Sequence, residues 1–551
     1  MKKITLLLLV VLSQTVFAQT KLPETQKLAA TCKVWGYLKY YHPQVASGKL
    51  DWDKQLFDVL PQIEKAQTKE EFSLVLEKWI DDLGTVPVNK PLTLEPETDF
   101  FTKNLSLDWT QNNKLFSKKL SQKLQFITDN RFQGKNYYVN REGSSVALQF
   151  TNEVVYPDFP WTDKNLRLLA LFRYWNYVEY FFPYKYVMDQ NWDEALVEIL
   201  PHIYTPDSEK DFVMAMRELS IKLNDTHAST FNVKMMEYFG GEKYIVAGTR
   251  IAEEKAVIVS LANDSLAKID DLKIGDVITK INGKTVAETL KYHSKYIEGS
   301  NKDAKVPSSG WVMFNGNTDD LEIEFIRDNT VAVKKIHRYL NQDIKRTPPI
   351  NTPKWKLLEN NIGYVDMSKV ETEDVKSMME ELKNTHAIIF DDRRRPKYTN
   401  FLINEYLNPE PKAICRDLFQ DLSFPGRYIW RKEMQICGKT NPDYYKGKVI
   451  VLVGAGTFSF AEQTAMSLQT APNTTIIGSQ TAGADGANYY FTIIKGFDSS
   501  FTSSGLFYPN KKETQRIGIL PNIEVKPTIL GVQQGKDEVL DRAIKFINTE
   551  E

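Results

Sequence analysis

A long internal repeat constrains the fold of this chain more than any other feature. The segment that begins at Trp35 reads WGYLKYYHP, and WNYVEYFFP begins at Trp175, 140 positions later. Further identities follow at the same offset, without a gap, as far as Leu223. Apolar residues within each copy fall at three- and four-residue spacing, which is typical of amphipathic helices. The repeat therefore predicts two related helical units, at about residues 22–86 and 162–226.

The two copies differ at their ends. The second copy ends in LNDTHAST and carries His227, where the first copy has Pro87. A histidine that served only the packing of a helical unit would be expected in both copies. The asymmetry favours a role for His227 that is specific to the second copy, with a structural histidine as the alternative.

Length and composition limit the class of protein. At about 100–200 residues per domain, 551 residues predict three to five domains. Aromatic residues make up 12% of the chain, enough for several cores, and exclude a mostly disordered protein. The net charge is −1 and no basic tract is present, so nucleic acid is not an expected partner.

The N-terminus has the pattern of a secretory signal peptide. Two lysines precede an apolar run, and small residues end at Ala18, which predicts cleavage after residues 1–18. The alternative is a membrane anchor, but the run is too short to cross ~30 Å of hydrocarbon. We therefore expect an exported protein, periplasmic or extracellular, without stable membrane insertion.

The remaining chain divides by pattern into four regions. Residues 19–160 contain the first helical unit and a segment, 90–158, whose period-two stretches, such as 135–139 and 145–150, predict strands. Residues 161–240 contain the second helical unit with His227. Residues 241–345 are predicted to be β-rich, and 346–548 alternate short apolar strands with helices, as in a mainly parallel sheet covered on both faces. The predicted fold class is multidomain α/β, α+β overall.

The β-rich region carries a hairpin pattern. Residues 272–286 read LKIGDVITKINGKTV, in which an Asn-Gly turn follows an alternating strand. The run resembles a PDZ domain, which binds a peptide as an added strand, and this implies peptide contacts at Ile274 and Ile278. The alternative is another small β domain with the same turn.

One strand-to-helix junction in the last region is a candidate catalytic turn. The apolar strand 449–453 runs into GAGTFSFAE, in which Ser459 stands just before a helix. Backbone N–H groups at a helix start can stabilise an oxyanion. The alternative is a serine that only caps the helix.

The context of Ser459 resembles the C-terminal processing peptidases, also called tail-specific proteases. Their Thr-x-Ser-x-x-Glu motif matches Thr457, Ser459 and Glu462, and QRIGILPN from Gln515 is similar to a later element of the family. A PDZ-like domain ahead of this core is also the family's arrangement. The resemblance covers about residues 165–548. It implies a serine peptidase with Ser459 as nucleophile and no cofactor.

The resemblance also indicates the general base. One branch of the family uses a Lys at the position of Ala484, so that base is missing here. The tricorn-like branch uses a His before the PDZ-like domain, preceded by a hydroxyl residue, and Thr226-His227 matches this pattern. The acidic partner of that branch falls on Gln515 here, so the orienting role is assigned to Gln515, with Glu513 as substitute.

The family's glycine-rich loop is altered. After Phe390 this chain reads DDRRRPK, without glycine. The Phe460 N–H remains as one oxyanion donor, and a backbone amide near Arg394 or Arg395 is the expected second donor. The loss of one donor commonly costs about 10²–10³ in rate. The arginines either form a solvated loop or bind a substrate carboxylate.

The cysteines leave two alternatives open. Cys415 and Cys437 could form a disulfide in an oxidising compartment, or all three thiols are reduced. None has a spacing typical of a zinc site, and no metal is predicted.

We therefore predict an exported serine endopeptidase that cleaves peptides or unfolded proteins, with access gated by the PDZ-like domain. The alternatives are a weak or inactive peptide-binding protein on the same fold and a structural protein that assembles through its helical units. The oligomeric state is not predicted.

Overall fold

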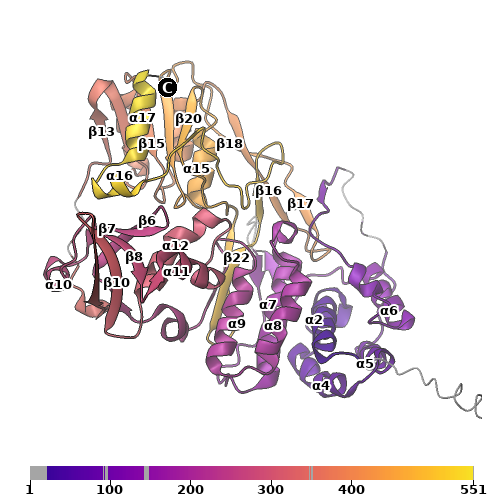
Figure 1. Ribbon diagram of the computed structural model, residues 1–551. Coiled ribbons are helices and arrows are strands. Elements are labelled where there is room, and N and C mark those ends of the chain that lie inside the picture. The colour runs from indigo at the N-terminus through magenta and orange to yellow at the C-terminus, as the bar shows by residue number, and fades with distance from the viewer. Residues whose placement is uncertain are drawn as a thin grey trace, which may run out of the picture.

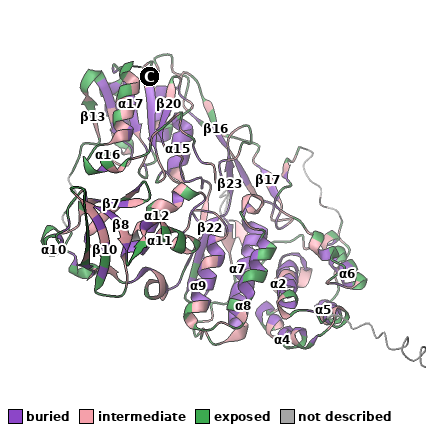
Figure 2. Ribbon diagram, viewed as in Figure 1, coloured by how far each residue is buried: buried purple, intermediate pink, exposed green. Residues whose placement is uncertain are grey.

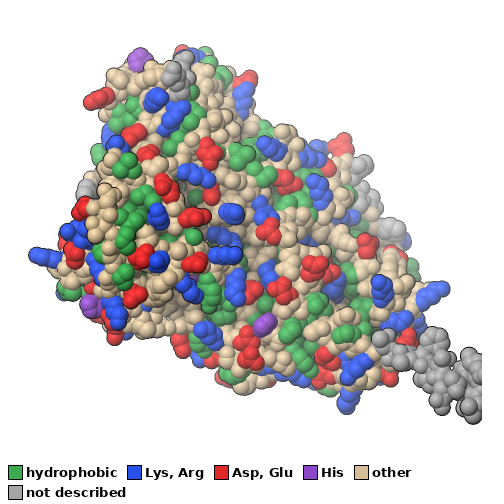
Figure 3. Space-filling view, in the orientation of Figure 1, with side chains coloured by type: hydrophobic (Ala, Val, Ile, Leu, Met, Phe, Trp, Pro, Cys, Tyr) green, Lys and Arg blue, Asp and Glu red, His purple; other side chains and the backbone are tan. Residues whose placement is uncertain are grey.

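The computed structural model describes residues 21–90, 92, 97–141, 148–346, 348 and 351–549. Figure 1 shows paired helical units, a β-rich unit and an α/β core. The signal peptide predicted for residues 1–18 lies outside the described residues. Within the described part of the chain, no helix is long and apolar enough to span a membrane. On the face seen in Figure 3, acidic and basic side chains are interspersed.

The predicted repeat is confirmed by the helix boundaries. Every main helix of the second copy begins 140 positions after its counterpart in the first copy, and the buried helices α2 and α7 also end in register (Figure 2). The first copy comprises α2 (Glu24–Tyr41), α4 (Trp52–Lys65) and α5 (Lys69–Asp82), and the second α7 (Lys164–Phe181), α8 (Trp192–Tyr204) and α9 (Glu209–Ile221).

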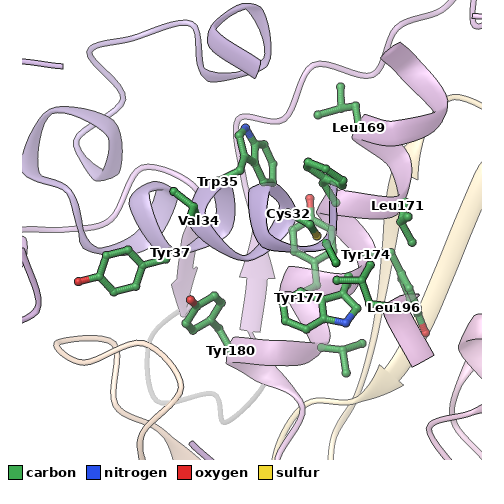
Figure 4. Close-up of a cluster of buried hydrophobic side chains, with 14 of the residues drawn as sticks. Cys32, Val34, Trp35, Tyr37, Leu169, Leu171, Tyr174, Tyr177, Tyr180 and Leu196 are labelled. Carbon is green, nitrogen blue, oxygen red and sulfur yellow. The ribbon is translucent and has the colours of Figure 1, made fainter. Parts of the chain in front are cut away.

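In each copy, two tryptophans on different helices exchange hydrogen bonds with each other's backbone. The Trp35 indole donates to the Trp52 carbonyl oxygen at 3.4 Å, and the Trp52 indole donates back at 3.2 Å. Trp175 and Trp192 repeat this exchange at 3.0 Å in both directions, and the ring centroids of each pair lie 6.2 Å apart. The predicted equivalence of Trp35 and Trp175 is confirmed. Figure 4 shows Trp35 beside side chains of the second copy.

The two copies pack with approximate twofold symmetry. Lys33 of the first copy pairs with Asp193 of the second at 2.7 Å, and the equivalent residues of the opposite copies, Arg173 and Asp53, pair at 2.5 Å. The equivalent positions Gly36 and Asn176 meet where α2 crosses α7. The Asn176 amide donates to the carbonyl oxygens of Cys32 and Phe172, at 3.0 and 2.8 Å.

The contact between Gly36 and Asn176 gives a stability prediction. A Cβ at position 36 would lie 1.8 Å from Asn176 Oδ1, so Gly36→Ala must displace this buried amide and break its hydrogen bonds. We expect the free energy of unfolding to fall by about 2–3 kcal/mol, measured by denaturant titration. Gly310→Ala is the matched control, because a Cβ there meets only Thr249 Oγ1 at 3.9 Å. Equal stability of the two variants would contradict the prediction.

The strand-rich prediction for residues 90–158 is wrong for most of the segment. Its largest element is the helix α6 (Lys118–Asp129), which Ser117 caps and which buries Leu120, Leu124 and Ile127 at helical spacing. The described strands are short: β1 (Phe100–Phe101), β2 (Val139–Arg141) and β3 (Leu148–Phe150). Part of the predicted stretch 145–150 lies outside the described residues.

The β-rich unit is an antiparallel sheet with the order β11-β10-β8-β7-β6, and β9 pairs with β8. The predicted hairpin is confirmed, because β8 and β9 pair across Asn282-Gly283. The strands are β6 (Ala247–Ala252), β7 (Lys255–Leu261), β8 (Val277–Ile281), β9 (Lys284–Thr285), β10 (Asp320–Arg327) and β11 (Thr330–His337).

The predicted peptide contact at Ile278 is wrong. Its side chain is fully buried in the core of this unit, because its face of β8 packs inward against Ala256 and Phe325. Ile274 is 59% exposed and lines a separate cavity beside the core, so it remains accessible. The opposite face of the sheet is also covered, since Val532 of α16 (Ile529–Gln533) packs on Val277.

The α/β core is confirmed. Its sheet has the order β13-β14-β15-β19-β20-β24, and all neighbours are parallel except β13 and β14. The strands are β13 (Trp355–Leu358), β14 (Ile362–Asp366), β15 (Ala387–Asp391), β19 (Lys448–Val453), β20 (Thr474–Gly478) and β24 (Ile523–Glu524). The helices include α13 (Val375–Leu382), α14 (Asn400–Leu407), α15 (Phe460–Leu468) and α17 (Glu538–Thr549).

Antiparallel strands that the sequence did not reveal connect this core to the helical units. Among them are β16 (Lys412–Gln420), β21 (Asn488–Ile494) and β22 (Phe497–Thr502). The strand β22 pairs with β4 (Ser229–Phe231), which begins two residues after His227. This pairing brings His227 to the core.

The cysteines are all buried and free. In the register of β16 with β18 (Gln435–Cys437), Cys415 lies opposite Gln435 rather than Cys437. The disulfide alternative is therefore wrong.

Candidate active site

Ser459 occupies a sharp turn between β19 and α15. Its φ of 58° and ψ of −122° lie outside the regions that side-chain-bearing residues favour. A strand-to-helix turn of this kind exposes a serine hydroxyl at the carboxyl edge of a sheet. The turn is held by Glu462, which is buried and accepts hydrogen bonds from the Ser459, Gly483 and Ala484 N–H groups at 3.3, 2.7 and 2.9 Å.

Thr457 ties the turn to the neighbouring strand end. Its hydroxyl donates to the Asp392 carbonyl oxygen at 2.9 Å and accepts from the Gly454 N–H at 3.1 Å. The loop that begins at Asp391 therefore lies beside the turn. The Thr and Glu of the sequence motif thus hold the backbone that presents the Ser459 hydroxyl.

The predicted approach of Ser459 and His227 is confirmed. Ser459 Oγ lies 3.0 Å from His227 Nε2, although 232 residues separate them. The His227 side chain is buried, and its ring packs against Phe458 with centroids 4.8 Å apart. A serine that only capped α15 would not require this contact.

A hydrogen-bond chain behind His227 defines its tautomer. Nδ1 lies 2.8 Å from Thr502 Oγ1, which lies 3.0 Å from Asp225 Oδ1. Asp225 also accepts from the Thr502 N–H at 2.8 Å and the His227 N–H at 3.1 Å. Because a carboxylate only accepts, the Thr502 hydroxyl donates to Asp225 and accepts from Nδ1–H. Nε2 is then unprotonated and accepts from the Ser459 hydroxyl.

The sequence assigned this supporting role to other residues, and the structure corrects it. Gln515 donates to Asp225 Oδ1 at 3.3 Å and makes no hydrogen bond to the His227 ring among the described residues. Glu513 accepts from the Tyr186 hydroxyl at 2.5 Å instead. Thr226 Oγ1 lies 2.9 Å from Ser300 Oγ and accepts from the Ser300 N–H at 3.0 Å.

The sequence reasoning missed Asp225 and Thr502. Asp225 had a local signal, since it stands two residues before His227. Thr502 had none, because the pairing of β22 with β4 brings it to the site from 275 residues away.

The site opens into a cavity of about 660 Å³ lined by Ser459, His227, Phe460 and Arg395, among others. The Phe460 N–H has no protein acceptor among the described residues, as expected for an oxyanion donor. The predicted use of the Arg395 amide as a second donor stays a prediction.

The three arginines of the altered loop have different surroundings. Arg393 pairs with Asp391 and Asp537 at 2.6 and 2.7 Å. Arg394 lines the separate cavity that contains Ile274. Only Arg395 lines the cavity of Ser459, so the loop is neither uniformly solvated nor a single arginine cluster.

The surroundings tune His227 as a base. Burial lowers the pKa of His227 from its ordinary value of 6.5, the Asp225 carboxylate opposes this shift, and the Arg395 guanidinium adds to it. A lowered pKa keeps the imidazole neutral at neutral pH, the form that accepts a proton.

This tuning predicts a pH effect. A general base accepts a proton only in its neutral form, so if activity depends on His227, the acid limb of kcat/KM should lie below pH 6.5. Arg395→Gln removes a charge that lowers this pKa, so the limb should move toward neutral pH. Lys397→Gln, in the same loop, is the control. Peptide cleavage measured across pH checks both variants, and a limb unmoved in Arg395→Gln would oppose the assignment.

Part of the site lies in a region that matches a known protein family. The model of peptidase family S41 matches residues 420–525, which include Ser459 and Glu462. The chain carries a peptidase family S41 domain. The resemblance to C-terminal processing peptidases is thereby confirmed, and the S41 domain indicates a peptidase whose substrates are peptides or proteins.

Similar proteins match a longer part of the chain than the S41 family model does. A carboxy-terminal-processing protease of Bartonella bacilliformis is 23% identical over 357 residues, which cover 62% of this chain and 75% of the relative. Mature CPAF in complex with lactacystin has a TM-score of 0.56 at 13% identity, covering 70% of this chain and 99% of CPAF. Another structure of mature CPAF gives the same TM-score at 12% identity, covering 70% of this chain and 98% of CPAF. These structures share the fold.

Among the described residues, no group of three or more His, Cys, Asp or Glu side chains is arranged to hold a metal ion.

Proposed function

We propose that this protein is a serine endopeptidase in which Ser459 is the nucleophile and His227 the general base. One observation carries the proposal: the Ser459 hydroxyl lies 3.0 Å from His227 Nε2, while Nδ1 is engaged through Thr502 with Asp225. This arrangement leaves Nε2 free to take the serine proton. The substrates would be peptides or unfolded proteins.

The acylation step follows from these contacts. Ser459 Oγ attacks the scissile carbonyl carbon while its proton passes to Nε2. The imidazolium that forms is stabilised by the Asp225 carboxylate through the Thr502 hydroxyl. The Phe460 N–H faces the carbonyl oxygen, where negative charge develops. Nε2–H then protonates the leaving amine, and the C–N bond breaks.

In deacylation His227 acts as general base a second time, now on a water molecule. A water molecule takes the place of the amine, and Nε2 accepts its proton as the water oxygen attacks the ester carbonyl. Collapse of the second oxyanion returns the proton from Nε2 to Ser459 Oγ. The products are two shorter peptides, and the resting tautomer of His227 is restored.

Active-site labelling tests the proposal directly. A fluorophosphonate probe reacts with an activated serine, so it should label the wild-type chain and leave Ser459→Ala unlabelled. Ser467→Ala, a change to a buried serine on α15, is the control for labelling elsewhere. If the wild type remains unlabelled although folded, the second candidate function is favoured: peptide binding without catalysis, consistent with the glycine-free loop before Pro396.

We also propose that the β-rich unit is PDZ-like and gates the site. This proposal is supported by hydrogen bonds that link the unit to the segment of His227 and to the segment beside the nucleophile turn. Ser300 bonds to Thr226, the residue before His227. Asn301 donates to the carbonyl oxygens of Thr481 and Ala482 at 2.9 and 3.1 Å, next to the segment that holds Glu462. A shift of this unit on peptide binding would therefore reach both the base and the nucleophile turn.

The gating proposal predicts that this link controls turnover. Asn301→Ala should lower kcat severalfold while the rate of fluorophosphonate labelling falls in parallel, because the nucleophile turn loses support. Asn317→Ala is the control, because the Asn317 side chain accepts from the Glu242 N–H and donates to the Glu237 carbonyl oxygen and, among the described residues, makes no hydrogen bond to the nucleophile turn. Unchanged turnover and labelling in Asn301→Ala would indicate that the unit is a spacer.

Export is also part of the proposal, on the N-terminal sequence pattern alone. Cell fractionation of the full chain, with N-terminal sequencing of the mature protein, tests it. A mature chain that starts at Gln19 is expected.

A further inference from the structure

The cavity beside Ser459 contains more acidic than basic side chains. Glu298, Asp417 and Asp485 line it, and Arg395 is its one arginine or lysine among the described residues. The small residues Gly486, Ala487 and Ser504 also line it and take up little of its volume.

Two of these carboxylates already have cationic partners. Glu298 pairs with Arg217. Asp417 lies 3.1 Å from Arg431 Nη1 and accepts from Gln435 Nε2 at 3.0 Å. These two acids are therefore largely compensated within the protein.

Asp485 has no such compensation. Its side chain is buried, with 4% of the residue exposed, and Oδ1 accepts only the Gly486 N–H, at 2.8 Å. Oδ2 is buried and lacks a hydrogen-bond partner among the described residues. The charges acting on it are those of Glu462 and Asp417, both acidic, and burial above all raises the pKa of Asp485 well above its ordinary value of 3.8. A buried carboxyl group without a partner is costly, and a cation that reached Oδ2 would relieve that cost.

The position of Asp485 ties it to the reaction. The preceding residue, Ala484, accepts the Ser459 N–H on its carbonyl oxygen at 3.1 Å, so Asp485 stands next to the nucleophile turn. Gln463, which lies on α15 one turn after Ser459, also lines the cavity.

The geometry points to a specificity pocket: Asp485 binds a lysine or arginine side chain of the substrate, at one fixed position next to the cleaved bond. This inference rests on the proposed function, because it describes the substrate of the same site. The ammonium or guanidinium donates to the Asp485 carboxylate, the one acid of the three without a cationic partner among the described residues. The carboxyl group releases its proton to solvent as the cation enters, so that the ion pair forms inside the cavity.

Mapping of cleavage sites tests the inference without assuming the position. The full chain is incubated with a mixture of unfolded proteins, and the new termini are identified by mass spectrometry. We expect lysine and arginine at one position to be enriched at least about fivefold over their abundance in the mixture. Asp485→Asn should remove this enrichment. Glu298→Gln is the matched control, because the Glu298 carboxylate lines the same cavity but is paired with Arg217. This variant should keep the enrichment.

A second measurement uses only the wild-type protein, in case Asp485→Asn does not fold. Two peptides that differ by lysine and norleucine at the mapped position have side chains of similar length and different charge. The lysine peptide should have a kcat/KM at least about tenfold higher. Equal rates, the absence of any basic enrichment, or enrichment that persists in a folded Asp485→Asn would overturn the inference.

The outcomes also separate this inference from the proposed function. Cleavage without basic preference would leave Ser459 and His227 as catalytic groups and remove only the role of Asp485. Absence of both cleavage and fluorophosphonate labelling in the wild type would instead contradict the peptidase activity itself.

Discussion

His227→Ala should lower kcat/KM by about 10⁶-fold, because Ser459 then has no group to accept its proton. In the proposed mechanism Ser459 and His227 act as one unit, so Ser459→Ala should have a similar effect, and the double variant should fall little further. The 3.0 Å contact between their side chains is the physical reason for this non-additivity. Steady-state cleavage of a reporter peptide measures all three variants.

The control for this prediction is another histidine. His386 is exposed at the start of β15 and takes no part in the site, so His386→Ala should retain activity within about twofold. Circular dichroism establishes that each variant is folded. Additive losses, in which the double variant falls by the product of the single effects, would show that Ser459 and His227 act independently.

Asp225→Asn should lower kcat by about 10²–10⁴-fold while the protein stays folded. The asparagine amide can donate to Thr502 Oγ1, which frees the threonine hydroxyl to donate to His227 Nδ1. The imidazole then carries its proton on Nε2 and cannot accept the proton of Ser459. The effect thus comes from the tautomer as well as from the lost charge.

Three further variants separate this mechanism from a structural role. Thr502→Val removes the relay hydroxyl and should reduce kcat in the same direction, whereas Thr502→Ser should restore much of it. Gln515→Ala removes only a neutral 3.3 Å contact to Asp225 and should cost no more than about tenfold. NMR of the His227 imidazole reports the tautomer directly. A Gln515→Ala loss as large as that of Asp225→Asn would instead favour the role first predicted for Gln515.

Some features of the site follow from local sequence. About 20 consecutive positions contain the strand at 449–453, the small residues after it and the helix that follows Ser459. The motif from Thr457 to Glu462 marks the turn. His227 was found by its absence from the first copy of the repeat and by the Thr-His pattern. These signals depend on short-range periodicity and on residue types at fixed spacing, which a sequence shows without its fold.

Other features were predicted wrongly from local sequence or could not be predicted from it. Residues 90–158 show strand-like alternation, but the amphipathic face of α6 prevails for Lys118–Asp129. Alternation along β8 also did not reveal that Ile278 faces the core while Val277 faces α16. Both errors come from packing partners that lie far away in the chain.

The sequence by itself determined the repeated helices, the α/β core and the identities of Ser459 and His227, because these depend on local patterns of hydrophobicity and turn chemistry. Only the tertiary structure decided which groups stand behind His227 and which carboxyl group remains unpaired in the cavity. Thr502 reaches His227 through the register of β22 with β4, and Asp485 lacks a cationic partner among the described residues, whereas the two other acids of the cavity pair with Arg217 and Arg431. Contacts between residues hundreds of positions apart depend on sheet register and burial, which no local pattern encodes.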